Sequence, residues 1–92
     1  MWTVVERKAA VKVIDALPPN AAEKYAFWLA VVRQSGPVGL RAIKGFHDEK
    51  LGGKMAHLRS SRLSLQWRVI YSVEASTVTV TVEQVTPHTY RP

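Results

Sequence analysis

Valine and threonine alternate near the end of the chain, and this alternation limits the fold more than any other feature of the sequence. From residue 77 to residue 82, threonines hold the odd positions and valines hold the even ones. Successive side chains of a β-strand point to opposite faces of the sheet. The pattern therefore predicts a strand over residues 77–85 with one apolar face and one polar face.

Two more strands are expected just before this one. Residues 55–64 and 66–73 are the candidates, and the turns between the three strands fall near residues 64–65 and 74–76. Turns this short join antiparallel neighbours. The last forty residues therefore predict a three-stranded antiparallel meander.

The amino-terminal half predicts one strand and two helices. Residues 2–6 are mostly apolar and β-branched, as in an opening strand. Residues 8–16 are helix formers with apolar positions near helical spacing, and Pro18 and Pro19 end that helix. A second helix is expected from about residue 21 to residue 34, with an aromatic and apolar stripe that faces the core.

The ends of the second helix carry their own signals. Asn20 is a good N-cap, and Glu23 stands three residues later, where a capping box needs an acid. Gly36 and Pro37 are expected to terminate the helix at its other end. One further helical turn is expected at residues 38–44.

These elements predict the α+β class, in the order βααβββ. Two amino-terminal helices pack on one face of a small, mainly antiparallel sheet, and the other face is expected to be open. A chain of 92 residues fits a single domain that spans residues 1–92.

Positive charge is concentrated in the middle of the chain. The whole sequence has a net charge of +6. Residues 41–68 contain seven Lys or Arg against the two acids Asp48 and Glu49, so this segment alone carries +5. Concentrated basic charge favours a polyanion or an acidic protein as the partner, while a solvated basic face is the simpler alternative.

Several kinds of protein and site are not expected. The chain has no cysteine, which excludes disulfides and thiolate metal sites. The histidines at positions 47, 57 and 88 lack the spacing of metal ligands, so we expect neither a metal nor another cofactor. The sequence shows no apolar run of about 18 residues and no secretory signal pattern, so the expected location is the cytoplasm.

Arginines recur at positions 59, 62 and 68, within two strands that are predicted to be neighbours. Arg62 alternates with Leu63, and Arg68 alternates with Trp67, so both arginines are expected side by side on the exposed face. Two guanidinium groups in such positions repel each other unless an anion joins them. Their fixed forks of donors suit phosphate.

Three stretches of the sequence carry a family resemblance. They are residues 45–53 (GFHDEKLGG), 61–71 (SRLSLQWRVIY) and 82–90 (VEQVTPHTY). Together they resemble the RelE/ParE toxin superfamily, and most closely its HigB-like branch of host-inhibition killer proteins. The motifs lie within half of the chain, residues 45–90, and the order of the elements is similar over all of it.

The resemblance implies a bacterial type II toxin that is inactive in complex with an antitoxin. The free toxin enters the ribosome and cleaves messenger RNA without a metal. In that reaction the ribose 2′-OH attacks the adjacent phosphate and leaves a 2′,3′-cyclic phosphate and a 5′-OH. The implied partners are the cognate antitoxin, the ribosome and the messenger, with no membrane and no small-molecule cofactor.

The resemblance also implies roles for single residues. Arg68 stabilises the charge of the transition state, His88 transfers a proton, and Tyr90 stacks on a base or assists that transfer. Contacts with the RNA backbone are expected from a second set of residues: Arg59, Arg62, Lys54, His57 and Arg91.

Two other functions stay open at this point. A ParE-like inhibitor of DNA gyrase uses the same fold as a protein-binding module, and an inactive homologue only binds its antitoxin. His88 and Tyr90 favour the nuclease, because a gyrase inhibitor needs no acid–base pair.

Overall fold

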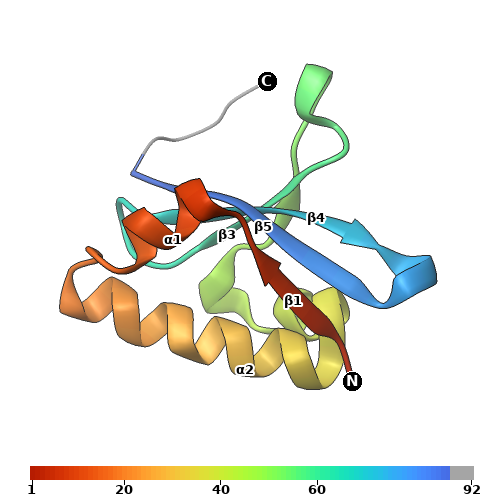
Figure 1. The fold of residues 1–92 in the computed structure, drawn as a ribbon, viewed down its shortest axis with the longest axis horizontal. Helices are drawn as coiled ribbons and strands as arrows, with labels where there is room; N and C mark the ends of the chain where they lie inside the picture. Colours follow the sequence, from red (N-terminus) through yellow and green to blue (C-terminus); the bar gives the residue numbers. More distant parts are fainter. Residues whose placement is uncertain (88–92) are drawn as a thin grey trace.

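The computed structural model describes residues 1–87, which form a five-stranded sheet with two helices packed against it (Figure 1). The strand order is β1–β5–β4–β3–β2, where β1 and β5 are parallel and all other neighbours are antiparallel. The strands are β1 (Thr3–Glu6), β2 (Glu49–Lys50), β3 (Arg59–Arg62), β4 (Arg68–Glu74) and β5 (Thr79–Thr86). The helices are α1 (Lys8–Ile14) and α2 (Pro19–Ala42), and the 3-10 turns are η1 (Lys44–Phe46), η2 (Gly53–Met55) and η3 (Ala75–Thr77). The predicted α+β class and its antiparallel meander are confirmed.

The strands of the meander are shorter or begin later than the sequence predicts. Strand β3 begins only after η2 and the turn that follows it. Between β3 and β4, Ser64 Oγ accepts hydrogen bonds from the backbone N–H groups of Gln66 and Trp67, which holds these residues in a turn. Strand β5 begins after Val78, whose φ of 51° lies in the left-handed region and breaks the extended chain.

The predicted capping box at the start of α2 is wrong. The helix begins at Pro19, with Pro18 as its N-cap and no side-chain cap. Proline has a helical φ already and lacks the N–H that a first helical residue leaves unpaired, so it is favoured at that position. Asn20 therefore lies inside the first turn, and its Oδ1 accepts a hydrogen bond from Ala21 N at 2.9 Å.

The predicted break near the other end of α2 is confirmed, and it lies at Gly36. This residue has φ 71° and ψ −167°, a backbone conformation that only glycine adopts without strain. The indole of Trp2 packs against it so closely that an added Cβ would lie 2.4 Å from Trp2 Nε1. Because Trp2 N also donates to Arg33 O at 2.8 Å, the break holds the start of β1 against α2.

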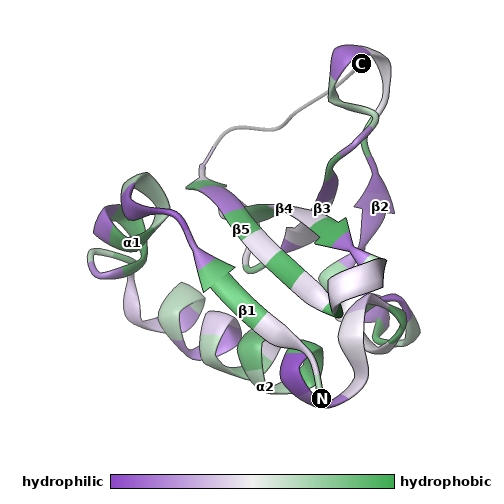
Figure 2. Cartoon of the chain, turned by 45° about the vertical axis from the view of Figure 1, so that its right-hand side comes forward, coloured by the Kyte–Doolittle hydropathy of each residue, from purple (hydrophilic) through white to green (hydrophobic). Residues whose placement is uncertain are grey.

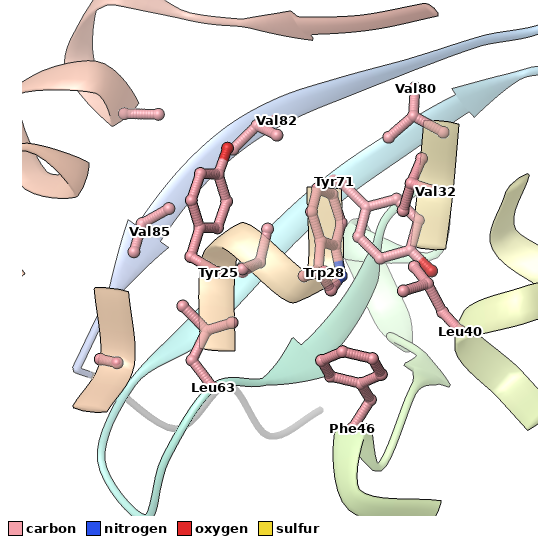
Figure 3. Packing of buried hydrophobic residues seen from close by; sticks show 13 residues of the cluster. Tyr25, Trp28, Val32, Leu40, Phe46, Leu63, Tyr71, Val80, Val82 and Val85 are labelled. Atoms are coloured by element: carbon pink, nitrogen blue, oxygen red, sulfur yellow. The ribbon is translucent and has the colours of Figure 1, made fainter. Parts of the chain in front are cut away.

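Trp28 lies at the centre of the core (Figure 3). Its ring stacks on Tyr25 with centroids 5.7 Å apart and meets Tyr71 edge-on at 5.4 Å. Its Nε1 donates to Ser61 Oγ at 3.0 Å, so the polar atom of a fully buried indole has a partner. The aromatic stripe of the second helix is therefore core, as the sequence predicts.

Hydropathy follows the layers of the fold. Strand β5 shows alternating apolar and polar bands (Figure 2), and its residues Val80, Val82 and Val85 are buried in the core. Trp67 also packs against this core, as expected. Within residues 1–87, no helix combines the length and the apolar character that crossing a membrane requires.

Replacing Gly36 by alanine should destabilise the protein far more than the same change at Gly53. Both glycines have positive φ, but an added Cβ meets Trp2 at Gly36 and nothing within 4 Å at Gly53. We expect Gly53→Ala to lower the free energy of unfolding by about 1 kcal/mol, from backbone strain alone, and Gly36→Ala by about 3 kcal/mol. Urea denaturation measures both, and equal losses would show that the Trp2 contact is unimportant.

Candidate nucleic-acid interface

Arg62 and Arg68 stand directly opposite each other on the sheet face that points away from the core. Arg62 of β3 is the register partner of Arg68 of β4, as predicted, and both side chains are half-buried. Arg68 Nη1 donates to Ser60 Oγ across the same pair of strands at 3.4 Å. The strand register therefore brings two guanidinium groups together on one face.

One nitrogen of this pair lacks an acceptor. Within the described chain, the Nε of Arg62 is the buried side-chain nitrogen that has no hydrogen-bond partner. A buried N–H without an acceptor costs about 1–3 kcal/mol, and a charged group costs more. An anion bound at the accessible parts of the Arg62 and Arg68 side chains would reduce the repulsion between the two cations.

The face that carries the arginines is open only in part, which corrects the expectation of an open face. Ser60, Ile70 and Thr86 share this face and are at most 3% exposed. Ile70 lies two residues from Arg68 on the same strand, so its apolar side chain points to the same face as the arginine. Burying this side chain stabilises the fold. The accessible part of the face therefore includes the two arginines and Gln84, the register partner of Ile70, but not its centre.

Glu83 also lies on this face, and sequence analysis missed it. It stands where the register of β4 and β5 shifts, in a β-bulge that turns its side chain toward Ser72 of β4. Its Oε2 accepts from Ser72 Oγ at 2.8 Å, and its Oε1 accepts from Arg7 Nε. The Arg7 hydrogen bond lowers the pKa of Glu83, and the Ser72 hydrogen bond and the charge of His57 act in the same direction.

Glu83 stands at an odd-numbered position, like Thr79 and Thr81, and this alternation was the one sign in the sequence that it belongs to the polar face. An acid at a polar-face position of a strand is ordinary. The ion pair with Arg7, 76 residues earlier, has no signature in the sequence.

Arg59 lies on the opposite face of the sheet, which corrects its grouping with Arg62. Its Nη2 and Nε lie 2.7 Å and 2.8 Å from Asp48 Oδ1. The Asp48 side chain is fully buried, and its Oδ2 also accepts from Ser61 Oγ at 2.7 Å and from the hydroxyl of Tyr71. Arg59 is thus a structural cation that compensates a buried carboxylate.

The remaining predicted site residues lie outside the pair of strands that carries Arg62 and Arg68. Lys54 lies in η2, His57 follows in the next turn, and both side chains are exposed. His88, Tyr90 and Arg91 lie outside the described residues, so their predicted roles stay predictions. In the described part of the chain, no group of three acids or histidines is arranged to hold a metal ion.

Comparison with known proteins gives matches among solved structures alone. No model of a protein family matches the chain, and no curated protein does. The RelE–RelB complex of the archaeon Pyrococcus horikoshii contains a chain 25% identical in sequence, with a TM-score of 0.74 over 94% of this chain and 93% of that one. A YoeB/ParE toxin from Agrobacterium tumefaciens is 21% identical, with a TM-score of 0.76 over 95% and 99%.

A third similar structure points to the same fold. The YoeB dimer from Staphylococcus aureus is 16% identical, with a TM-score of 0.75 over 97% of this chain and 98% of that chain. All three similarities span nearly the whole length of both chains. The resemblance to the superfamily is therefore confirmed at the level of the fold, while its HigB-like branch stays a prediction.

Removing the Asp48 carboxylate should be costly, because it leaves the Arg59 cation without its anion. We expect Asp48→Ala to lower the free energy of unfolding by about 3 kcal/mol. Glu49→Ala is the matched control, since Glu49 is the next residue and is exposed, and its loss should change stability by less than about 0.5 kcal/mol. Thermal or urea unfolding measures the stability of both variants. Equal losses in the free energy of unfolding would contradict a structural role for Asp48.

The protein should lose stability steeply in alkali. Burial raises the pKa of Tyr71 and of Tyr25, and their hydrogen bonds to Asp48 and Glu6 raise it further. An unfolded tyrosine loses its proton near pH 10, while these folded ones keep theirs, so the unfolded state binds fewer protons above that pH. The free energy of unfolding should then fall by up to about 1.4 kcal/mol per pH unit for each tyrosine.

Tyr71→Phe isolates one of these two contributions. The variant should show a shallower loss of stability between pH 10 and pH 11.5, even though it is less stable than the wild type at neutral pH. Urea midpoints measured at several pH values test this, and an unchanged slope would contradict the assignment.

Proposed function

We propose that this chain, which has the fold of the RelE/ParE toxin superfamily, is the toxin of a type II toxin–antitoxin pair and cleaves messenger RNA on the ribosome. The observation that carries the proposal is the cross-strand pair of Arg62 and Arg68, in which the buried Arg62 Nε has no hydrogen-bond partner among residues 1–87. A phosphodiester would place its negative charge beside these two cations. The proposal keeps residues 1–92 as one toxin domain of the HigB-like branch, acting in the cytoplasm where ribosomes and messenger meet.

The proposed reaction needs three events at one phosphate. The O2′ of the ribose forms a bond to phosphorus, the bond from phosphorus to O5′ breaks, and the phosphate passes through a state with additional negative charge. One group removes the 2′-OH proton and another gives a proton to O5′. The products are a 2′,3′-cyclic phosphate and a 5′-OH, with neither metal nor cofactor taking part.

The chain offers candidate groups for stabilising the charge and for transferring a proton. Arg68 stabilises the charge on the phosphate, and Arg62 contacts the RNA backbone beside it. His88 transfers a proton, since an imidazole titrates near neutral pH, and Tyr90 stacks on a base or assists the transfer. Lys54, His57 and Arg91 stay in the proposal as backbone contacts, whereas Arg59 leaves it because Asp48 engages it.

We further propose an antitoxin with an acidic binding segment. The Pyrococcus relative is a complex of a RelE toxin with RelB. In the present chain, residues 41–68 carry +5 of the net +6, which favours an acidic partner through charge complementarity. The proposed partners are therefore the antitoxin, the ribosome and its messenger.

Cleavage of ribosome-bound messenger by purified variants tests the proposal. Arg68→Ala should lower the single-turnover rate by about a hundredfold or more, because the guanidinium is aimed at the transition-state charge. Arg68→Lys should recover only part of the rate, since lysine lacks the planar fork of donors. His88→Ala should also slow cleavage by about a hundredfold. Lys12→Ala removes one positive charge from α1, which contributes no residue to the proposed site, and should leave the rate unchanged.

Expression of the wild type in a host separates the three candidate functions. Rapid arrest of translation is expected, whereas filamentation with DNA damage would indicate a ParE-like gyrase inhibitor, and normal growth would indicate an inactive homologue. Efficient cleavage of free RNA that chelators abolish, or full activity of a folded Arg68→Ala variant, would overturn the proposed mechanism.

A further inference from the structure

The carboxylate of Glu83 is a feature of the arginine face that the proposed cleavage does not use. It lies on the same side of the sheet as Arg62 and Arg68, at the β-bulge in β5. A carboxylate repels phosphate, so a face that binds RNA only through its backbone gains nothing from one. β-Bulges often turn a side chain toward a neighbouring active site, and the contacts of Glu83 show where this one points.

Fold stability is a weak explanation for this carboxylate. Its ion pair with Arg7 is largely exposed, with the Arg7 side chain 61% accessible, and exposed ion pairs contribute little to stability. Proton transfer is a weak explanation as well. The lowered pKa of Glu83 keeps the group ionised and makes it a poor base near neutral pH. The remaining explanation for the Glu83 carboxylate is that it recognises a ligand through hydrogen bonds.

Glu83 has acceptor capacity to spare. An ionised carboxylate has about four acceptor sites on its two oxygens. Among residues 1–87, Arg7 uses one site on Oε1 and Ser72 uses one on Oε2, so each oxygen keeps a site that no described residue occupies. The side chain is 24% accessible, and the two contacts fix its orientation. The result is a pair of adjacent acceptors that Arg7 and Ser72 hold from two sides.

Among unpaired bases, guanine matches such a pair best. Its Watson–Crick edge presents the N1–H and N2–H donors side by side. Adenine and cytosine place an acceptor beside their amino group, and uracil has a single N–H between two carbonyl oxygens. A fixed carboxylate therefore accepts two hydrogen bonds from guanine, while it meets a repelling acceptor or a single donor on every other base.

We propose that Glu83, held by Arg7 and Ser72, recognises an unpaired guanine in the RNA that the arginine pair binds. Ser72 lies four residues along β4 from Arg68, roughly 13 Å at the rise of a strand. The guanine therefore belongs to a nucleotide near the phosphate at Arg68 and not to that phosphate itself. This inference rests on the proposed RNA-binding role of the face, and it adds a sequence preference to it.

A binding experiment with the free protein tests the inference without relying on cleavage. The probe is a short, labelled single-stranded RNA with one guanine, made uncleavable by 2′-deoxy nucleotides, and a second probe carries inosine instead. Inosine lacks the N2 amino group, so the wild type should bind it about tenfold more weakly. Glu83→Gln should bind both probes equally, because the amide offers a single acceptor atom.

Glu74→Gln is the matched control. This substitution removes one negative charge at the end of β4 farthest from Arg68, where the Glu74 carboxylate accepts a hydrogen bond from Ser76 Oγ in the turn. This variant should keep the preference for guanine. Equal or undetectable binding of the two probes by the wild type, a preserved preference in Glu83→Gln, or a lost preference in Glu74→Gln would each overturn the inference.

Sequencing of cleavage ends on ribosomes separates this inference from the proposed function. Messages with randomised codons should show guanine enriched about tenfold at one position near the cut for the wild type, and the enrichment should vanish for Glu83→Gln. Guanine preference in binding without any cleavage would support the recognition site and reject the nuclease. Cleavage without enrichment at any neighbouring position would support the nuclease and reject the recognition site.

Discussion

The buried carboxylate of Asp48 is the interaction on which the arrangement of this sheet depends. It accepts hydrogen bonds from Arg59, Ser61 and Tyr71, and Ser61 in turn accepts from the indole of Trp28. These contacts join the segment after α2 to β3 and β4 from the core side. Strand β3 has only four residues, and it pairs with β2 on one side and β4 on the other.

The two faces of β3 are coupled by the alternation of a strand. Because Arg59 and Ser61 point to Asp48, Ser60 and Arg62 must point to the other face. There Ser60 accepts from Arg68, and Arg62 lies opposite Arg68 with an unpaired Nε. A satisfied polar network on one side thus holds an unsatisfied cation on the other. Preorganisation of this kind lets an incoming anion bind without first ordering its donors.

Sequence patterns predicted the helices and strands in which the alternation of apolar and polar residues continues over many positions. The alternation before Val85 predicted β5, the aromatic stripe predicted α2, and parity placed Arg62 beside Arg68. Strand β2 escaped prediction because two polar residues have no period, and its pairing with β3 depends on tertiary contacts. The capping box failed because Pro19 starts the helix two residues earlier, an effect of backbone geometry that outweighs a side-chain preference.

The contacts of Arg59 and Glu83 escaped prediction for one physical reason. Arg59 and Arg62 have the same chemistry on the same strand, and what separates their roles is which of them meets an acid. Asp48 lies 11 residues before Arg59, and Arg7 lies 76 residues before Glu83, so neither pair has a local signature. Parity predicts the face of each side chain, but its partner depends on the loop that folds over that face.

Similarity of fold does not by itself decide what this chain does, because the same fold carries different chemistries. At 25% identity or less, the relatives share the course of the backbone far more than the side chains of the site. Function therefore has to be argued from the few groups on the arginine face. An unpaired guanidinium nitrogen calls for an anion, while a fixed carboxylate that stays ionised calls for a donor. Single-stranded RNA offers both, the anion in its backbone and the donors on its bases, and neither a bare phosphate nor an acidic peptide does so in the same way.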